Sequence, residues 1–258
     1  MAHEGDFHSL LQRSSVAGIV PLQLEEREGR LNENIEVHGT TVIAVKYDRG
    51  VINIGDRRAT ANMTVMYDRA EKVLALDDYT LLAISGSYAR AMEVVRYLRH
   101  SFKYFERSQL QPMSLDGKLS ELARVIAQGL PLAMQGIGGF IPILSTYDIQ
   151  SNEGRIFFYD GMGARFESAE YGAAGSGSQP IRGIFDYIVK IKKPFHQMNR
   201  EEALREALLL LGIAADLDTA TGGYYVVPPL AKTITAEGIT DVGEDELREL
   251  IASLPGRN

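Results

Sequence analysis

The chain has 258 residues, of which 45% are hydrophobic and 24% are charged, enough for one large domain or two small ones with an ample core. The formal net charge of −7, with no block of lysines and arginines, argues against a surface that neutralises nucleic-acid phosphates. Cysteine is absent, which excludes disulfides, thiolate metal sites and a cysteine nucleophile, and fits a reducing compartment.

The five histidines lack the spacing of metal ligands, so we expect no metal site and no cofactor. The apolar run "VAGIVPLQL" is too short to span a bilayer, and Pro21 interrupts it. Acidic Glu4 and Asp6 lie where a signal peptide would be basic. The sequence therefore predicts a cytoplasmic protein with no membrane segment.

Residues 1–39 form a polar leader with seven acidic and three basic residues. Its apolar residues follow no sustained period, so we expect weak intrinsic order there. The character changes at Thr40, where residues 40–47 and 51–59 read as a β-hairpin of β-branched and apolar residues. Residues 72–78 and 79–87 repeat the pattern, which gives four strands before any helix.

A helix over residues 88–109, with Ser87 as its N-cap, and a second helix over 114–135 follow. Strands are then expected within 138–148, 154–161 and 164–175, helices over 179–190 and 200–217, strands over 223–230 and 231–239, and a closing helix over 243–254. This order is not the βαβα alternation of a parallel sheet, so it predicts a layered α+β domain with antiparallel sheets and helices outside them.

The Gly39–Thr40 junction suggests a nucleophile. If this bond is cut, Thr40 carries both a hydroxyl and a free α-amine, whose ordinary pKa of about 8 lets it accept the hydroxyl proton. While Gly39 is attached, the nitrogen is an amide and the site is silent, which would explain the leader. The alternative is that Thr40 and Thr41 are ordinary strand residues, because threonine favours strands.

Three residues downstream of Thr40 favour chemistry: Asp56, Lys72 and Gly86 follow it by 16, 32 and 46 positions. If the four strands form one sheet, these residues come from its ends and turns and can converge on Thr40. Lys72 would lower the pKa of the hydroxyl, Asp56 would fix Lys72, and the Gly86 N–H could stabilise an oxyanion. Taken one at a time, each has an ordinary explanation: Lys72 as a lysine in a turn, Asp56 as a cap, and Gly86 as part of a helix entry.

These residues lie in segments that resemble bacterial, more narrowly actinobacterial-like, proteasome β-type subunits. The matching segments are "HGTTVIAVKYDRGVINIGDRRAT", "EKVLALDDYTLLAISGS", "AMQGIGGFIPILSTYDI", "GAAGSGS" and "DTATGG", and the likeness covers about Thr40 to the C-terminus. The resemblance implies an N-terminal nucleophile hydrolase fold, a four-layer αββα sandwich, with residues 1–39 as a propeptide removed by self-cleavage and 40–258 as the catalytic domain.

By match to the family's motifs, Ser176, Asp218 and Thr221 complete the hydrogen-bond network around the threonine amine; many branches have serine where Thr221 stands. The resemblance also places Thr60 on the edge that pairs with an extended substrate backbone. Residues expected to line or border the primary specificity pocket are Ala59, Ala70, Leu74, Ile84 and Tyr88. The small Ala70 and the apolar Ile84 suggest cleavage after bulky apolar residues, although Tyr88 is larger than its usual counterpart. The alternative is that these residues are core positions at a strand–helix junction.

The function implied is a threonine endopeptidase that degrades unfolded proteins inside a gated chamber. Its partners would be copies of itself in two stacked seven-membered rings, α-type subunits, a ring-shaped ATPase unfoldase and protein substrates. Three alternatives stay open: a non-catalytic ring subunit, the simpler two-ring ATPase-dependent bacterial threonine peptidase, and a small-amide hydrolase of the same superfold. The retained Thr40, Asp56 and Lys72 disfavour the first, while chain length and "GDRRAT" disfavour the second.

Overall fold

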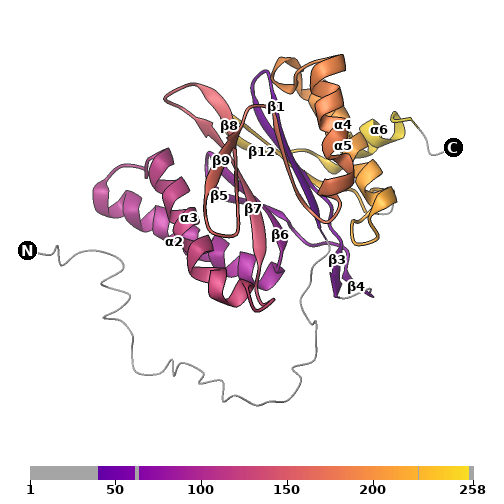
Figure 1. Cartoon of the computed structure of the whole chain (residues 1–258). Coiled ribbons are helices and arrows are strands. Elements are labelled where there is room, and N and C mark those ends of the chain that lie inside the picture. Colours follow the sequence, from indigo (N-terminus) through magenta and orange to yellow (C-terminus); the bar gives the residue numbers. More distant parts are fainter. Residues whose placement is uncertain (1–39, 62–63, 226, 256–258) are drawn as a thin grey trace, which may run out of the picture. The chain divides into compact units, whose positions relative to one another are not determined.

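Two five-stranded antiparallel sheets dominate the computed structural model, which describes residues 40–61, 64–225 and 227–255 (Figure 1). The first sheet has the strand order β10 (Tyr171–Gly175), β1 (Thr41–Tyr47), β2 (Gly50–Gly55), β11 (Leu230–Thr235) and β12 (Gly238–Asp241). The second sheet has the order β5 (Val73–Asp77), β6 (Thr80–Gly86), β7 (Phe140–Asp148), β8 (Glu153–Tyr159) and β9 (Arg165–Ser168). β1, which begins next to Thr40, is therefore paired on both sides.

The core is arranged in layers, and β1 shows why. Its even positions Val42 and Ala44 pack between the two sheets, with Leu81 and Ile143 of the second sheet. Its odd positions, Ile43, Val45 and Tyr47, face the opposite way, toward helices. Side chains alternate along a strand, so a continuous apolar run is buried on both faces only when each face is covered.

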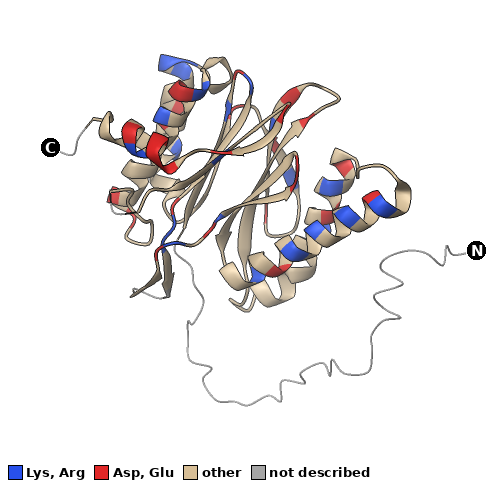
Figure 2. Cartoon of the chain, turned by 180° about the vertical axis from the view of Figure 1, so that it is seen from behind, with Lys and Arg blue, Asp and Glu red and all other residues tan. Residues whose placement is uncertain are grey.

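Helices cover the outer faces of both sheets (Figure 1). The second sheet packs against α2 (Tyr88–Gln109) and α3 (Leu115–Ala133). The first sheet packs against α4 (Ser178–Tyr187), α5 (Arg200–Leu217) and α6 (Glu244–Ala252). One π-helical turn, Ile188–Lys192, extends α4, and a short 3-10 turn, Phe195–Gln197, precedes α5. Charged residues gather on these helices, whereas the strands between them carry few (Figure 2). The predicted αββα sandwich is confirmed.

A two-stranded hairpin, β3 (Ala59–Ala61) with β4 (Thr64–Tyr67), stands outside both sheets. The sequence analysis missed it, because the two strands are short and the residues of β4 are all exposed. Six strands, not four, therefore precede the first helix after Thr40. The condition that the four predicted strands form one sheet is not met: β1 and β2 belong to the first sheet, and β5 and β6 to the second.

Two local predictions need correction. Residues 223–230 were expected to form a strand, but β11 begins only at Leu230. Pro228 and Pro229 precede it and have no N–H to donate to a sheet. Ser87 does occupy the N-cap position of α2, yet its side chain makes no capping hydrogen bond. In the described part of the chain, no helix has the length and hydropathy needed to cross a bilayer.

Candidate active site

Thr40 lies directly before β1 and is 4% exposed. The predicted partners come from five different places in the fold. Asp56 follows β2, Lys72 precedes β5, Gly86 ends β6, and Ser176 follows β10, while Asp218 is the C-cap residue of α5 and Thr221 lies in the loop after it. The stacking of the two sheets brings the ends of these elements together at the start of β1. The cleavage bond and the leader involve residues 1–39, which lie outside the described residues.

Asp56 and Lys72 form a buried ion pair. Lys72 Nζ lies 2.9 Å from Asp56 Oδ1, and the two side chains are 2% and 0% exposed. Lys72 also donates a hydrogen bond to the backbone carbonyl of Arg58. Three backbone N–H groups complete the coordination of the carboxylate: Thr41 donates to Oδ1 at 2.7 Å, and Arg58 and Gly222 donate to Oδ2 at 3.0 and 2.9 Å. The predicted pairing of Asp56 with Lys72 is thus present in the structure.

Burial is the largest influence on the pKa of the Lys72 ammonium group. Removal from water holds the pKa of Lys72 below its ordinary value, and the attraction of the Asp56 carboxylate opposes this shift only in part. A lysine with a lowered pKa can exchange a proton more readily near neutral pH than a solvated one. The pair therefore supplies a positive charge and a proton donor or acceptor close to the start of β1.

Asp218 is the centre of a second polar cluster. Its Oδ2 accepts hydrogen bonds from the hydroxyls of Ser176 and Thr221, each at 2.6 Å. Its Oδ1 accepts from the backbone N–H of Ala220 at 3.2 Å. The structure therefore brings Ser176, Asp218 and Thr221 together, and their role around the threonine amine, implied by the resemblance, stays a prediction.

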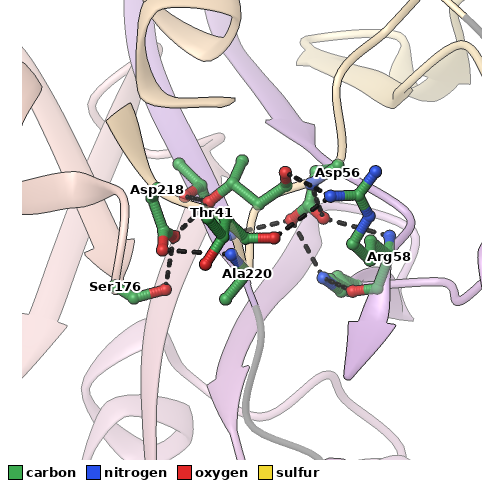
Figure 3. A network of polar contacts seen from close by, with 10 residues as sticks. Thr41, Asp56, Arg58, Ser176, Asp218 and Ala220 are labelled. Atoms are coloured by element: carbon green, nitrogen blue, oxygen red, sulfur yellow. Dashed lines mark hydrogen bonds and ion pairs between the residues drawn. The ribbon is translucent and has the colours of Figure 1, made fainter. Parts of the chain in front are cut away.

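Thr41 and Arg58 join the two clusters (Figure 3). The Thr41 hydroxyl lies 2.6 Å from the Thr221 hydroxyl, while the Thr41 N–H binds Asp56. Arg58 Nη1 donates to the backbone carbonyls of Thr219 and Thr221 at 3.1 and 3.2 Å. The Asp56 and Asp218 clusters are consequently parts of one hydrogen-bonded network around the first residues of β1.

Sequence reasoning missed both of these linking residues. Thr41 was considered only in the alternative to a nucleophilic Thr40, as an ordinary strand residue, and Arg58 was noticed only as part of "GDRRAT". A signal was available for Thr41, because two adjacent threonines at a strand start place one hydroxyl on each face. For Arg58 the sequence carries no comparable signal, because its partners, Thr219 and Thr221, lie 161 and 163 residues away.

Gly86 ends β6 with a φ of 93°, in the left-handed region that favours glycine. A Cβ at this position would lie 2.5 Å from the carbonyl oxygen of Gly139, so only glycine fits. Gly86 and Ser176 both line a cavity of about 700 Å³ beside β10. The cavity could admit part of a polypeptide next to the polar network.

The expected pocket residues are mostly buried. Leu74 and Ile84 belong to the core that packs against α2, and Tyr88, the first residue of that helix, is half-buried against the same core. Ala59 and Thr60 lie on β3. The Ala70 N–H donates a hydrogen bond to the backbone carbonyl oxygen of Arg57 at 2.9 Å. Exposure is 7% or less for these residues apart from Tyr88. Their role as a specificity pocket stays a prediction. Among the described residues, no group of three or more potential metal ligands is found.

Comparisons with known proteins agree with this geometry. A family model described as "Proteasome subunit" matches residues 36–228. A proteasome subunit beta of Jonesia denitrificans is 37% identical, over 83% of this chain and 70% of its own. Proteasome subunit beta 1 of Streptomyces avermitilis is 39% identical over 83% of this chain and 75% of its own, and a proteasome subunit beta of Frankia casuarinae is 34% identical over 84% and 78%. The resemblance to actinobacterial proteasome β subunits is confirmed.

Proposed function

The chain belongs to the proteasome subunit family, and from this premise we propose that it is the proteolytic β subunit of a bacterial proteasome core particle. We further propose that it is a threonine endopeptidase made as an inactive precursor. One observation carries the proposal: the buried Lys72–Asp56 pair and the Asp218 cluster meet at the residue that follows Thr40. A ring subunit without chemistry has no evident need for a buried charge pair at that point, because such pairs are weak contributors to stability.

The proposed reaction is acyl transfer to Thr40. The Thr40 hydroxyl oxygen attacks the carbonyl carbon of the scissile bond, and the hydroxyl proton passes to the free α-amine of the same residue. The resulting oxyanion accepts a hydrogen bond from the Gly86 N–H. The protonated amine then gives its proton to the leaving amine of the substrate. Water hydrolyses the remaining ester and regenerates the hydroxyl.

Lys72, Asp56 and the Asp218 cluster support these steps. The Lys72 ammonium lowers the pKa of the nearby hydroxyl by charge attraction, and Asp56 holds the ammonium in position. Ser176, Asp218 and Thr221 orient the α-amine once it is free. In the precursor, the same hydroxyl oxygen attacks the carbonyl carbon of Gly39, the bond from that carbon to the Thr40 nitrogen breaks, and the nitrogen takes up the hydroxyl proton and becomes the free amine. Water then hydrolyses the ester between Gly39 and the Thr40 oxygen and releases the leader.

Substrate and partners follow from the same proposal. Thr60 on β3 offers backbone pairing to an extended polypeptide, a mode that tolerates many sequences. Apolar Leu74 and Ile84 favour cleavage after bulky apolar residues. Seven copies form a ring, two such rings stack, and α-type rings gate the chamber for an ATPase unfoldase in the cytoplasm.

The test is the intact mass of the chain after co-expression with an α-type subunit. Wild type should lose residues 1–39 and hydrolyse a peptide with a bulky apolar residue before the cleaved bond. Thr40→Ala should assemble, keep the leader and show no hydrolysis, because it lacks the nucleophile. Thr40→Ser is the matched control, since it keeps a hydroxyl and should retain both reactions at reduced rates.

Two results would count against the proposal. Uncleaved wild-type chains in fully assembled rings would favour a non-catalytic subunit. Cleavage after Gly39 in purified Thr40→Ala would rule out self-cleavage by the threonine hydroxyl.

A further inference from the structure

We propose that Thr41 is a positioning residue whose hydroxyl couples the nucleophile Thr40 to the Asp218 cluster, an inference that rests on the proposed function. Thr41 itself touches no reacting atom in this scheme. It acts through the geometry of the residue before it, because the two residues share a peptide bond. Hydrogen bonds anchor Thr41 on two sides, one of them runs toward the Asp218 cluster, and the residue is fully buried.

Three hydrogen bonds fix Thr41. Its N–H donates to Asp56 Oδ1 at 2.7 Å, and its carbonyl accepts from the Asp56 N–H at 3.1 Å. The third bond joins its hydroxyl to the Thr221 hydroxyl at 2.6 Å. The first two hold the backbone on the side of Asp56, and pairing of β1 with β10 places Gly175 opposite Thr41. The third bond connects the side chain of Thr41 directly to the Asp218 cluster.

The direction of the third bond follows from counting protons. A threonine hydroxyl has one proton to donate, and a carboxylate oxygen only accepts. Thr221 gives its proton to Asp218 Oδ2. Thr41 must therefore be the donor to Thr221, which makes a directed chain from the Thr41 hydroxyl through Thr221 to Asp218.

Close packing leaves no room for another donor to replace the Thr41 hydroxyl in this series of hydrogen bonds. Thr41 is 0% exposed and Thr221 is 1% exposed, so bulk water does not reach the bond. A Cβ on Gly177 would lie 2.3 Å from Thr41 Oγ1 and 2.7 Å from Thr221 Oγ1. Loss of the Thr41 hydroxyl would leave the Thr221 oxygen without its donor and would free the start of β1 to shift relative to Asp218.

The decisive variant is Thr41→Val, which keeps the shape of threonine and removes the hydroxyl. In the full chain assembled with its α-type partner, kcat for a fluorogenic peptide should fall by about 10²-fold, because small misplacements of reacting groups have effects of this size. KM should stay within about twofold, since the substrate contacts are untouched. Rates are normalised to the fraction of chains that have lost residues 1–39, measured by intact mass. Thr41→Ser restores the hydroxyl and should recover kcat to within about threefold of wild type.

Two controls separate positioning from general destabilisation. Thr233→Val removes another buried hydroxyl, on β11 of the same sheet, and should leave kcat unchanged. The double variant Thr41→Val/Thr221→Val should be slower than Thr221→Val alone by no more than about twofold, because both changes remove one shared bond. If Thr41→Val fails to assemble, Thr221→Val removes the partner of the Thr41 hydroxyl instead. This variant should lower kcat and leave KM unchanged.

Several outcomes would overturn the inference. If Thr41→Val or Thr221→Val has the same kcat as wild type, the hydrogen bonds from Thr41 through Thr221 to Asp218 do not position the nucleophile. Equal losses in Thr41→Ser and Thr41→Val, or additive losses in the double variant, show a role in packing alone. If wild type neither loses its leader nor hydrolyses peptide, the proposed function is refuted, and the role of Thr41 with it. If wild type is active and Thr41→Val has the same kcat, only the role of Thr41 is refuted.

Discussion

The carboxylates of Asp56 and Asp218 lie on two sides of Thr41 and are held in different ways (Figure 3). Asp56 is 1% exposed and is bound by an ammonium group and three backbone N–H groups. Asp218 is half-buried at the end of α5 and is bound by two hydroxyls and one backbone N–H. The first site is built around a compensated charge, and the second around neutral donors.

This difference indicates separate duties. A buried carboxylate with four donors cannot turn without breaking several bonds, so Asp56 is suited to hold Lys72 at a fixed point. The hydroxyl donors of Asp218 can rotate about their C–O bonds. Asp218 is therefore suited to adjust to the amine that appears when the leader leaves. The following predictions test whether the two sides differ in this way.

The largest effect is expected for Lys72→Met. Loss of the ammonium should lower the peptidase rate by about 10³-fold or more, equivalent to about 4 kcal/mol of transition-state stabilisation. The fold should survive, because three backbone N–H groups still satisfy Asp56. The measurement is kcat/KM together with the thermal unfolding midpoint.

Lys118→Met is the matched control for that prediction. Lys118 also forms an ion pair, with Asp77 at 2.8 Å, but it lies on α3 away from the network. Its peptidase rate should equal that of wild type. A near-normal rate in Lys72→Met would remove Lys72 from the mechanism.

A smaller effect, on stability, should separate the two carboxylates. Asp56→Ala strips the acceptor from the buried Lys72 ammonium, from the buried Thr41 N–H and from two part-buried N–H groups, and should lower the free energy of unfolding by at least about 3 kcal/mol. Asp218→Ala should cost about 1 kcal/mol, because one of its donors, the Ser176 hydroxyl, is exposed and can bind water instead. Denaturant titration of both variants measures the difference. Equal losses would show that the two sides are equivalent structurally.

The smallest effect concerns pH. The pKa of Lys72 is lowered in the folded chain, so between that value and the ordinary value of 10.5 the unfolded chain binds the extra proton. Stability must therefore rise with pH across that window. The wild type should gain stability relative to Lys72→Met as pH rises through the lowered pKa toward 10.5. A constant difference between the two unfolding curves would contradict a lowered pKa.

Much of the fold was predictable from local pattern. Residues 88–109 and 200–217 were expected as helices and match α2 and α5, because their apolar positions recur at helical spacing and no proline interrupts them. The start of β1 beside Thr40 was equally clear from its β-branched run. The hairpin of β3 and β4 and the division into two sheets were not predictable, because short exposed strands lack a period and sheet membership is decided by distant pairing.

The sequence by itself pointed to Asp56 and Lys72 through their spacing from Thr40, and its resemblance to the proteasome family added Ser176, Asp218 and Thr221. Only the tertiary structure decided that Thr41 and Arg58 join the Asp56 cluster to the Asp218 cluster. The physical reason is the range of the interactions. Strand and helix patterns depend on neighbours a few positions apart, whereas the Thr41 and Thr221 hydroxyls are 180 residues apart and meet only when the first sheet packs against α5.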